Sequence, residues 1–298
     1  MLKQRLLIVG CGDIALRLVR LLDARYRVYA LTHSPVRFDL LRAAGVVPLR
    51  GDLDDAASLS RIAGLAHAIV HFAPPPKEGR NDRRTRNLLA ALSKANSVPQ
   101  RLVFISTSGV YGDCGGAVVD ETRPISPDSA RAVRRADAER RLRAWGRSRG
   151  VNVSILRVPG IYAADRLPMA RIEGNVPALN DADDGYSNHI HAEDLARIAL
   201  AALRSGRPNR VYHASDDEPM KMGDYFDLLA DHFSLPRPPR VSWQEAQETI
   251  PRGLLSFMRE SRRLTNERIK RELGVKLVYP SVRDAIVPDD VRIKNISH

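Results

Sequence analysis

Short apolar segments alternate with amphipathic ones through the first half of the chain. The apolar segments are rich in Val, Ile and Leu, as expected of parallel strands that are buried on both faces. Six repeats of one strand–helix pattern predict right-handed crossovers and an α/β fold with a doubly wound parallel sheet. The expected strands are 6–9, 27–31, 46–49, 68–72, 102–106 and 152–157, and the expected helices are 14–22, 38–44, 56–62, 83–95 and 130–147.

The pattern changes after residue 157. Several prolines and the polar stretch 180–187 predict loops, and a helix at 193–203 and a strand at 210–213 are expected to return to the sheet. The rest of the chain has helical spacing with proline-rich breaks. We therefore expect a larger domain of residues 1–165, completed by 188–215, and a smaller, mostly helical substrate-binding cap formed by 166–187 and 216–298.

Composition excludes several classes of protein. No apolar segment approaches the roughly 20 residues of a membrane helix, and the N-terminal residues lack the features of a signal peptide. Two cysteines cannot build a disulfide framework or a closed zinc site. We expect a cytoplasmic protein without a metal, in which Asp194, near His189 and His191, caps the start of the helix at 193 instead of binding a metal ion.

The chain is strongly basic, with a net charge of +12 and a pI near 10.1. Most of the basic residues are arginines, and they are spread along the chain instead of forming a stripe beside a nucleic-acid-reading motif. Nucleic acid is therefore an unlikely partner, and an anionic small molecule suits the same charge. The arginine-rich run 131–149 is expected to be a helix with its charges in solvent, and a binding patch is the alternative.

The first expected strand ends in a glycine-rich turn, Gly10-Cys11-Gly12-Asp13-Ile14-Ala15, which leads directly into a helix. This GxGxxA pattern is typical of a Rossmann dinucleotide site. Gly10 takes the tight turn, Gly12 lets the backbone approach a pyrophosphate, and the free N–H groups of the helix start receive the anion. Gly10, Gly12, Asp13 and Ile14 are therefore predicted to bind the cofactor.

The end of the second strand indicates which dinucleotide binds. NAD sites usually carry a carboxylate here, which accepts a hydrogen bond from the ribose 2′-hydroxyl. This chain has Thr32, His33, Ser34 and Arg37 instead, which suit a 2′-phosphate. NADP(H) is favoured over NAD(H), although Arg37 could equally be a solvated residue of a helical first turn.

Further motifs, in the same order, resemble the extended short-chain dehydrogenase/reductase superfamily, in particular its NAD-dependent epimerase/dehydratase branch. The matching segments are Gly51-Asp52-Leu53, His71-Phe72-Ala73 and residues 81–89, 105–112, 157–162 and 190–196. The resemblance implies a cofactor across the carboxyl ends of the strands, contacted also by Asp52, Leu53, Phe72, Ala73, Pro74 and Ser106.

The resemblance also implies a reaction and a partner. Members of this family move a hydride between a nicotinamide and hydroxyl or carbonyl compounds, mostly nucleotide sugars. The resemblance places four residues of this chain against the substrate: Tyr111, Tyr162, Arg166 and Asn188. The substrate can bear a phosphate group. The helix at 130–147 corresponds to one that often forms a homodimer interface.

The chain departs from the family at its catalytic pair. The family uses Tyr-x-x-x-Lys with a Ser or Thr, and this chain keeps Thr107 but contains no Tyr-x-x-x-Lys. One alignment puts Arg131 and Arg135 at the Tyr and Lys positions, and another puts Asp128 and Ala132 there. A guanidinium is a poor proton acceptor. Four residues on nearby loops are candidates for the missing acid–base group: Tyr111, Cys114, Glu121 and Tyr162.

Two functions are therefore open. The first is an oxidoreductase or epimerase-like enzyme with a modified acid–base arrangement, which the retained Thr107 and the substrate-side motifs favour. The second is a non-catalytic protein that senses the state of a bound NAD(P)(H), which the missing tyrosine and lysine favour.

Overall fold

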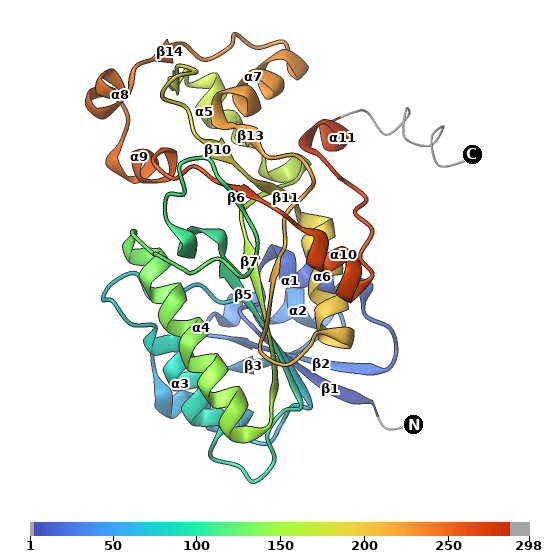
Figure 1. Ribbon diagram of the computed structural model, residues 1–298. Coiled ribbons are helices and arrows are strands. Elements are labelled where there is room, and N and C mark those ends of the chain that lie inside the picture. Colours follow the sequence, from blue (N-terminus) through green and yellow to red (C-terminus); the bar gives the residue numbers. More distant parts are fainter. Residues whose placement is uncertain (1–2, 287–298) are drawn as a thin grey trace.

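A seven-stranded parallel sheet forms the centre of the protein (Figure 1). The computed structural model describes residues 3–286. The strand order is β12-β7-β5-β4-β1-β2-β3, and this confirms the predicted doubly wound α/β fold. The strands of this sheet are β1 (Gln4–Val9), β2 (Tyr26–Thr32), β3 (Val47–Arg50), β4 (Ala68–His71), β5 (Arg101–Thr107), β7 (Asn152–Val158) and β12 (Arg210–His213).

Helices cover both faces of the sheet, because alternate residues of each strand point to opposite faces. Leu6 and Ile8 of β1 belong to the core cluster under α1 and α6, whereas Leu7 and Val9 belong to the cluster under α3 and α4. The strand order reverses between β1 and β4, and ligands bind at such a switch point in open α/β sheets. The covering helices are α1 (Asp13–Leu21), α2 (Phe38–Ala43), α3 (Arg83–Leu92), α4 (Ala130–Arg149) and α6 (Ala192–Ser205).

Two helix predictions need correction. Residues Ala56–Ile62 form a 3₁₀ helix, η2, which begins where the side chain of Asp55 accepts a hydrogen bond from Ala57 N. The helix expected to reach residue 95 ends at Leu92. The Ser93 hydroxyl there bonds to the carbonyl of Leu89 at 2.8 Å, a local bond that competes with helix continuation.

Short elements fill the region that the sequence predicted as loops, and a mostly helical region follows β12. The two-residue and three-residue strands pair with segments far away in the sequence, for example β15 with β6. The elements are β6 (Val118–Val119), β8 (Gly160–Tyr162), α5 (Met169–Glu173), β9 (Ala178–Leu179), β10 (Tyr186–Ser187), β11 (His189–His191), β13 (Met220–Lys221), α7 (Met222–His232), β14 (Arg240–Val241), α8 (Trp243–Thr249), α9 (Arg252–Met258), β15 (Arg263–Leu264), α10 (Glu267–Leu273) and α11 (Val282–Ile286).

The division into two domains stays a prediction, and residues 1–2 and 287–298, which it includes, lie outside the described part. Within residues 3–286, no helix combines the length and apolar character that crossing a bilayer requires.

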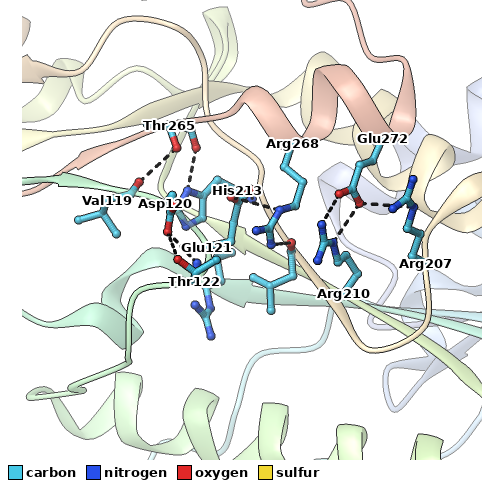
Figure 2. A network of polar contacts seen from close by, with 12 residues as sticks. Val119, Asp120, Glu121, Thr122, Arg207, Arg210, His213, Thr265, Arg268 and Glu272 are labelled. Atoms are coloured by element: carbon cyan, nitrogen blue, oxygen red, sulfur yellow. Dashed lines mark hydrogen bonds and ion pairs between the residues drawn. The ribbon is translucent and has the colours of Figure 1, made fainter.

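A polar network fastens the C-terminal segment to the edge of the sheet (Figure 2). The backbone N–H of His213, on β12, donates to Oε1 of Glu121 at 3.0 Å. The ring Nδ1 of His213 lies 2.8 Å from the carbonyl oxygen of Thr265. Arg268, on α10, approaches the second oxygen of Glu121 at 3.5 Å. The segment that contains Glu121, which follows the short strand β6, is therefore connected to β12 and to α10.

Candidate cofactor and active site

A cavity of about 510 Å³ opens at the carboxyl ends of the parallel strands. It lies at the expected switch point and continues from the glycine-rich turn to the end of β5. All the residues predicted to contact the cofactor line it, although their binding roles stay predictions. They are Gly10, Gly12, Asp13, Ile14, Thr32, His33, Ser34, Arg37, Asp52, Leu53, Phe72, Ala73, Pro74 and Ser106.

The glycine-rich turn has the geometry of an anion site. Gly10 has a φ of +85°, and a Cβ there would lie 2.5 Å from the backbone nitrogen of Ala73, so a side chain cannot fit. Gly12 is the N-cap of α1 and provides no side chain to bond the N–H groups of the first turn. A Cβ on Gly12 would meet no atom within 4 Å. The helix start is therefore open for a diphosphate to approach.

A cation lies beside this turn. Arg37 ends the 3₁₀ helix η1 (Pro35–Arg37), and its guanidinium lines the cavity. Burial raises the pKa of the Cys11 thiol to about 11, and the positive charge of Arg37 opposes that rise, which places the charge near the turn. The Nε of Arg37 is buried and has no hydrogen-bond partner among the described residues. An anionic ligand would satisfy it.

Two arginines of α4 form part of the opposite end of the cavity. Arg131 and Arg135 are one helical turn apart and line it together with Thr107, whereas Asp128 and Ala132 are not among its lining residues, and the catalytic roles of all four stay predictions. Arg135 donates to the carbonyl of Ala73 at 3.2 Å. Burial lowers the pKa of Arg135 to about 10.

The cavity lining, within the described residues, contains no tyrosine and no lysine. The four residues predicted as candidates for the missing acid–base group all lie outside that lining. Tyr111 is buried, where its hydroxyl accepts from Arg157 at 2.7 Å and lies 2.6 Å from Nε2 of His213. Glu121 is engaged by His213 and Arg268 in the network of Figure 2. Cys114 and Tyr162 are likewise absent from the lining.

The residues expected to meet the substrate are dispersed. Arg166 lines the cofactor cavity, where it pairs with Asp13 at 3.1 Å. Tyr162 is buried beside the cap. Asn188 connects β11 to the cap, because its Nδ2 donates to the carbonyl of Arg262 at 2.9 Å and its Oδ1 accepts from Leu264 N at 2.8 Å. The substrate roles of these residues and of Tyr111 stay predictions.

Nothing in the sequence indicated that Glu260, which lies between α9 and β15, is close to this site. A Cβ on Gly109 would lie 3.5 Å from the hydroxyl oxygen of Thr107 and 3.7 Å from Oε2 of Glu260. The carboxylate and the retained threonine hydroxyl therefore both lie close to Gly109. No motif surrounds Glu260, and its position depends on the folding of the cap against β5.

The histidine pair has a structural role at one of its two positions. His191 is the N-cap of α6, and its ring accepts from Glu193 N at 3.3 Å. The prediction that Asp194 caps this helix is wrong, because its carboxylate accepts from the backbone N–H groups of Val278 and Tyr279 at 3.0 and 2.8 Å. Among residues 3–286, no group of three or more His, Cys, Asp or Glu is arranged to hold a metal ion.

Comparison with known proteins decides the family. Residues 7–215 match the sequence profile of the NAD dependent epimerase/dehydratase family. The chain belongs to this family. It is 30% identical to a dTDP-glucose 4,6-dehydratase of Mycolicibacterium smegmatis over 210 residues. The alignment covers 61% of each of the two chains. An uncharacterized Schizosaccharomyces pombe protein is 24% identical over 306 residues, with 96% and 99% of the two chains covered.

Solved structures share the fold over nearly the whole chain. A conserved protein of unknown function from Silicibacter pomeroyi is 28% identical, with a TM-score of 0.78 and coverage of 98% and 99% of the two chains. A dTDP-glucose 4,6-dehydratase from Streptomyces venezuelae, solved with NAD bound, is 22% identical, with a TM-score of 0.75 and 95% of each chain covered. At that identity the second comparison concerns the fold alone.

Proposed function

We propose that this family member is an NAD(P)-dependent enzyme that acts on a hydroxyl or carbonyl carbon of a small substrate, with nucleotide sugars as the first class to test. One observation carries the proposal: a continuous cavity joins an anion-binding turn at Gly12 to the hydroxyl of Thr107. The named activities of the sugar-nucleotide relatives support the substrate class, although the alignment covers only 61% of the length of the first of them.

NADP(H) is the preferred cofactor in this proposal, with NAD(H) as the alternative. The residues that would hold it are the first turn of α1 for the diphosphate and Arg37, with Thr32 and Ser34, for the 2′-phosphate. The buried Nε of Arg37, without a partner among the described residues, supports this assignment. When bound, the cofactor supplies a nicotinamide that accepts or donates a hydride.

The protein's own residues position the substrate oxygen. Thr107, at the end of β5, presents a hydroxyl that can hydrogen-bond the reacting oxygen, and it already accepts from Gly109 N at 3.2 Å. Arg131 and Arg135 place two positive charges beside the same end of the cavity and so lower the cost of negative charge on that oxygen. Neither arginine is a suitable proton acceptor.

The alternative function is a protein that binds NAD(P)(H) and reports its redox state to a partner without catalysis. The absence of tyrosine and lysine from the described lining of the cavity favours it. The two functions differ in one measurable property, because only the enzyme converts a substrate.

The division into a cofactor domain (1–165 with 188–215) and a substrate-binding cap (166–187 and 216–298) is also part of the proposal, as is a homodimer formed through α4. The exposed arginines of α4 include Arg140 and Arg147. Substitution of both by glutamate should shift a dimer toward monomer in sedimentation analysis. An unchanged mass would exclude this interface.

The first experiment is a calorimetric titration with NADP⁺, NADPH, NAD⁺ and NADH at one salt concentration. The protein is then incubated with the preferred cofactor and dTDP-glucose or UDP-glucose, with hydride transfer followed by absorbance and products by mass spectrometry. Binding of either NADP(H) or NAD(H), together with product formation, supports the enzyme. Binding without turnover of either sugar supports the sensor, and absence of binding to all four forms contradicts both functions.

A further inference from the structure

A carboxylate from the segment between α9 and β15 lies close to the retained threonine, next to the cofactor cavity. Thr107 ends β5, and Gly109 lies in the 3₁₀ helix η3 (Ser108–Tyr111) that follows it. The two atoms closest to the missing Cβ of Gly109 are the Thr107 hydroxyl oxygen at 3.5 Å and Glu260 Oε2 at 3.7 Å. Both distances are ordinary van der Waals contacts, so the hydroxyl and the carboxylate lie close to the same point beside Gly109.

Glu260 is held in place by Arg262. Arg262 donates to its Oε2 at 2.6 Å, and the same guanidinium donates to the carbonyl of Gly112 at 2.7 Å, which fixes it to the loop after η3. The side chains of Glu260 and Arg262 are only 12% and 10% exposed. The carboxylate is therefore oriented by a buried guanidinium and does not move freely in solvent.

Glu260 lies next to the cofactor cavity, although it is not among the described residues that line it. Burial lowers the pKa of Arg131, which lines the cofactor cavity, and the negative charge of Glu260 opposes this, so the two groups lie near each other. Glu260 lines a second cavity of about 650 Å³ together with residues of α8 and α9. The charged side chains that share this second cavity are Asp113, Asp128 and Arg259.

We propose that Glu260 is the general acid–base of this enzyme and contacts the reacting oxygen of the substrate opposite Thr107. This inference rests on the proposed function. It assigns the proton transfer, for which the lining of the cofactor cavity offers neither the usual phenol nor a lysine. A carboxylate is a competent general base, whereas the neighbouring guanidinium groups are not.

The step is balanced as follows. In the oxidative direction the carbon that carries the hydroxyl loses a hydride, with both electrons of its C–H bond, to the oxidised nicotinamide. The hydroxyl loses its proton to the carboxylate of Glu260, and a C=O double bond forms. The products are a ketone, the reduced cofactor and a protonated Glu260. In the reductive direction Glu260 returns the proton to the oxygen.

A binding measurement tests the position of Glu260 without a substrate. The oxidised nicotinamide ring carries a positive charge and the reduced ring does not, so a nearby carboxylate favours the oxidised form. In Glu260→Gln the preference for NADP⁺ over NADPH, measured by calorimetry, should fall by about threefold or more, as for one charge lost several ångströms away. The control is Glu248→Gln, which removes the same charge from an exposed position on α8 and should leave the ratio unchanged.

An activity measurement tests the role. Glutamine keeps the shape of Glu260 and can still accept a hydrogen bond from Arg262, so the fold should remain intact by circular dichroism. With dTDP-glucose or UDP-glucose, Glu260→Gln should lower kcat at least 100-fold, the lower range of general acid–base contributions, with little change in KM. The limb of the pH–rate profile that depends on a carboxylate should disappear in Glu260→Gln and persist, shifted, in Glu260→Asp.

The outcomes separate the two proposals. An unchanged oxidised-to-reduced binding ratio in Glu260→Gln overturns the assignment of Glu260 while leaving the proposed function intact. If the oxidised-to-reduced binding ratio changes in Glu260→Gln but kcat and the pH–rate profile do not, Glu260 lies near the nicotinamide and the acid–base role is overturned. If wild-type protein binds none of the four nicotinamide dinucleotides, the proposed function itself fails.

Discussion

The hydroxyl of Ser106 donates a hydrogen bond of 2.6 Å to Oε1 of Glu139, which connects the end of β5 to α4. The same carboxylate makes a buried ion pair with Arg157 of β7, with Nη2 and Oε2 2.8 Å apart. The side chains of the pair are 5% and 4% exposed. The wall of the cofactor cavity is therefore supported by a charged group that does not itself line the cavity.

Loss of this carboxylate should strongly destabilise the protein. Glu139→Ala leaves Arg157 buried without its counter-charge, which costs about 3–5 kcal/mol in the free energy of unfolding. Urea denaturation measures it. The matched control is Asp39→Ala, because Asp39 forms an exposed pair with Arg42, and such pairs contribute about 0–1 kcal/mol. Equal losses in the two variants would contradict the structural role of Glu139.

The two glycines of the turn should respond differently to alanine. Gly10→Ala should lower the unfolding free energy, because its φ is positive and its Cβ would clash with the backbone of Ala73. Gly12→Ala should fold normally, since its Cβ meets no atom, and should weaken cofactor binding by keeping the diphosphate away from α1. Gly12→Asp, with a negative charge, should abolish binding. Thermal melts and calorimetry distinguish the two effects, and unaltered affinity in Gly12→Asp would remove the diphosphate assignment.

Arg37 should determine which cofactor is preferred. If its guanidinium binds a 2′-phosphate, Arg37→Ala should weaken NADPH binding by about 1.5–3 kcal/mol, the value of a lost hydrogen bond to a charged group. NADH, which lacks that phosphate, should bind as before. The comparison variant is Arg42→Ala, whose side chain is exposed and pairs with Asp39. Equal losses for NADPH and NADH in Arg37→Ala would contradict the preference.

Asp216 should make stability depend on pH. Its side chain is buried, and burial raises its pKa to about 9, although hydrogen bonds from the Glu218 backbone and the Tyr162 hydroxyl oppose the rise. The unfolded pKa is near 3.9, so between about pH 4 and pH 9 the folded protein holds a proton that the unfolded chain has released. This contribution to stability is complete below pH 4 and is lost as the pH rises toward 9.

The test is Asp216→Asn, which cannot titrate. The slope of unfolding free energy against pH should become shallower by up to about 1.4 kcal/mol per pH unit in that window. Urea denaturation from pH 5 to pH 8.5 measures it, with Asp39→Asn, at an exposed position away from Asp216, as the control. Parallel slopes in wild type and Asp216→Asn would contradict the raised pKa.

The parallel sheet and the lining of the cofactor cavity could be predicted because their signals are local. A buried parallel strand shows as an apolar run, and the strand ends must meet at one edge, so residues as distant as Gly12, Asp52 and Ser106 were expected together and line one cavity. The spacing of Arg131 and Arg135 by one helical turn likewise fixes that they share a face of α4.

The cap contributions could not be predicted in this way. Glu260 reaches Gly109 because the segment around β15 pairs with β6, a contact of two residues with no sequence signature. The contacts of the tyrosine in the retained motif around β5 could not be predicted either, and its substrate role stays a prediction. Its hydroxyl is satisfied inside the protein by Arg157 and His213, which are distant in sequence from Tyr111.

The match to the family's sequence profile ends at residue 215, and all seven strands of the large sheet lie before that residue. A protein shortened to this limit would nevertheless expose the edge that the network of Figure 2 closes, because the ring of His213 would lose the carbonyl of Thr265 and Glu121 would be left buried without Arg268. The segment that matches the family profile is thus shorter than the segment that must be expressed to obtain a stable sheet. A fragment designed to isolate the cofactor-binding region should extend through α10.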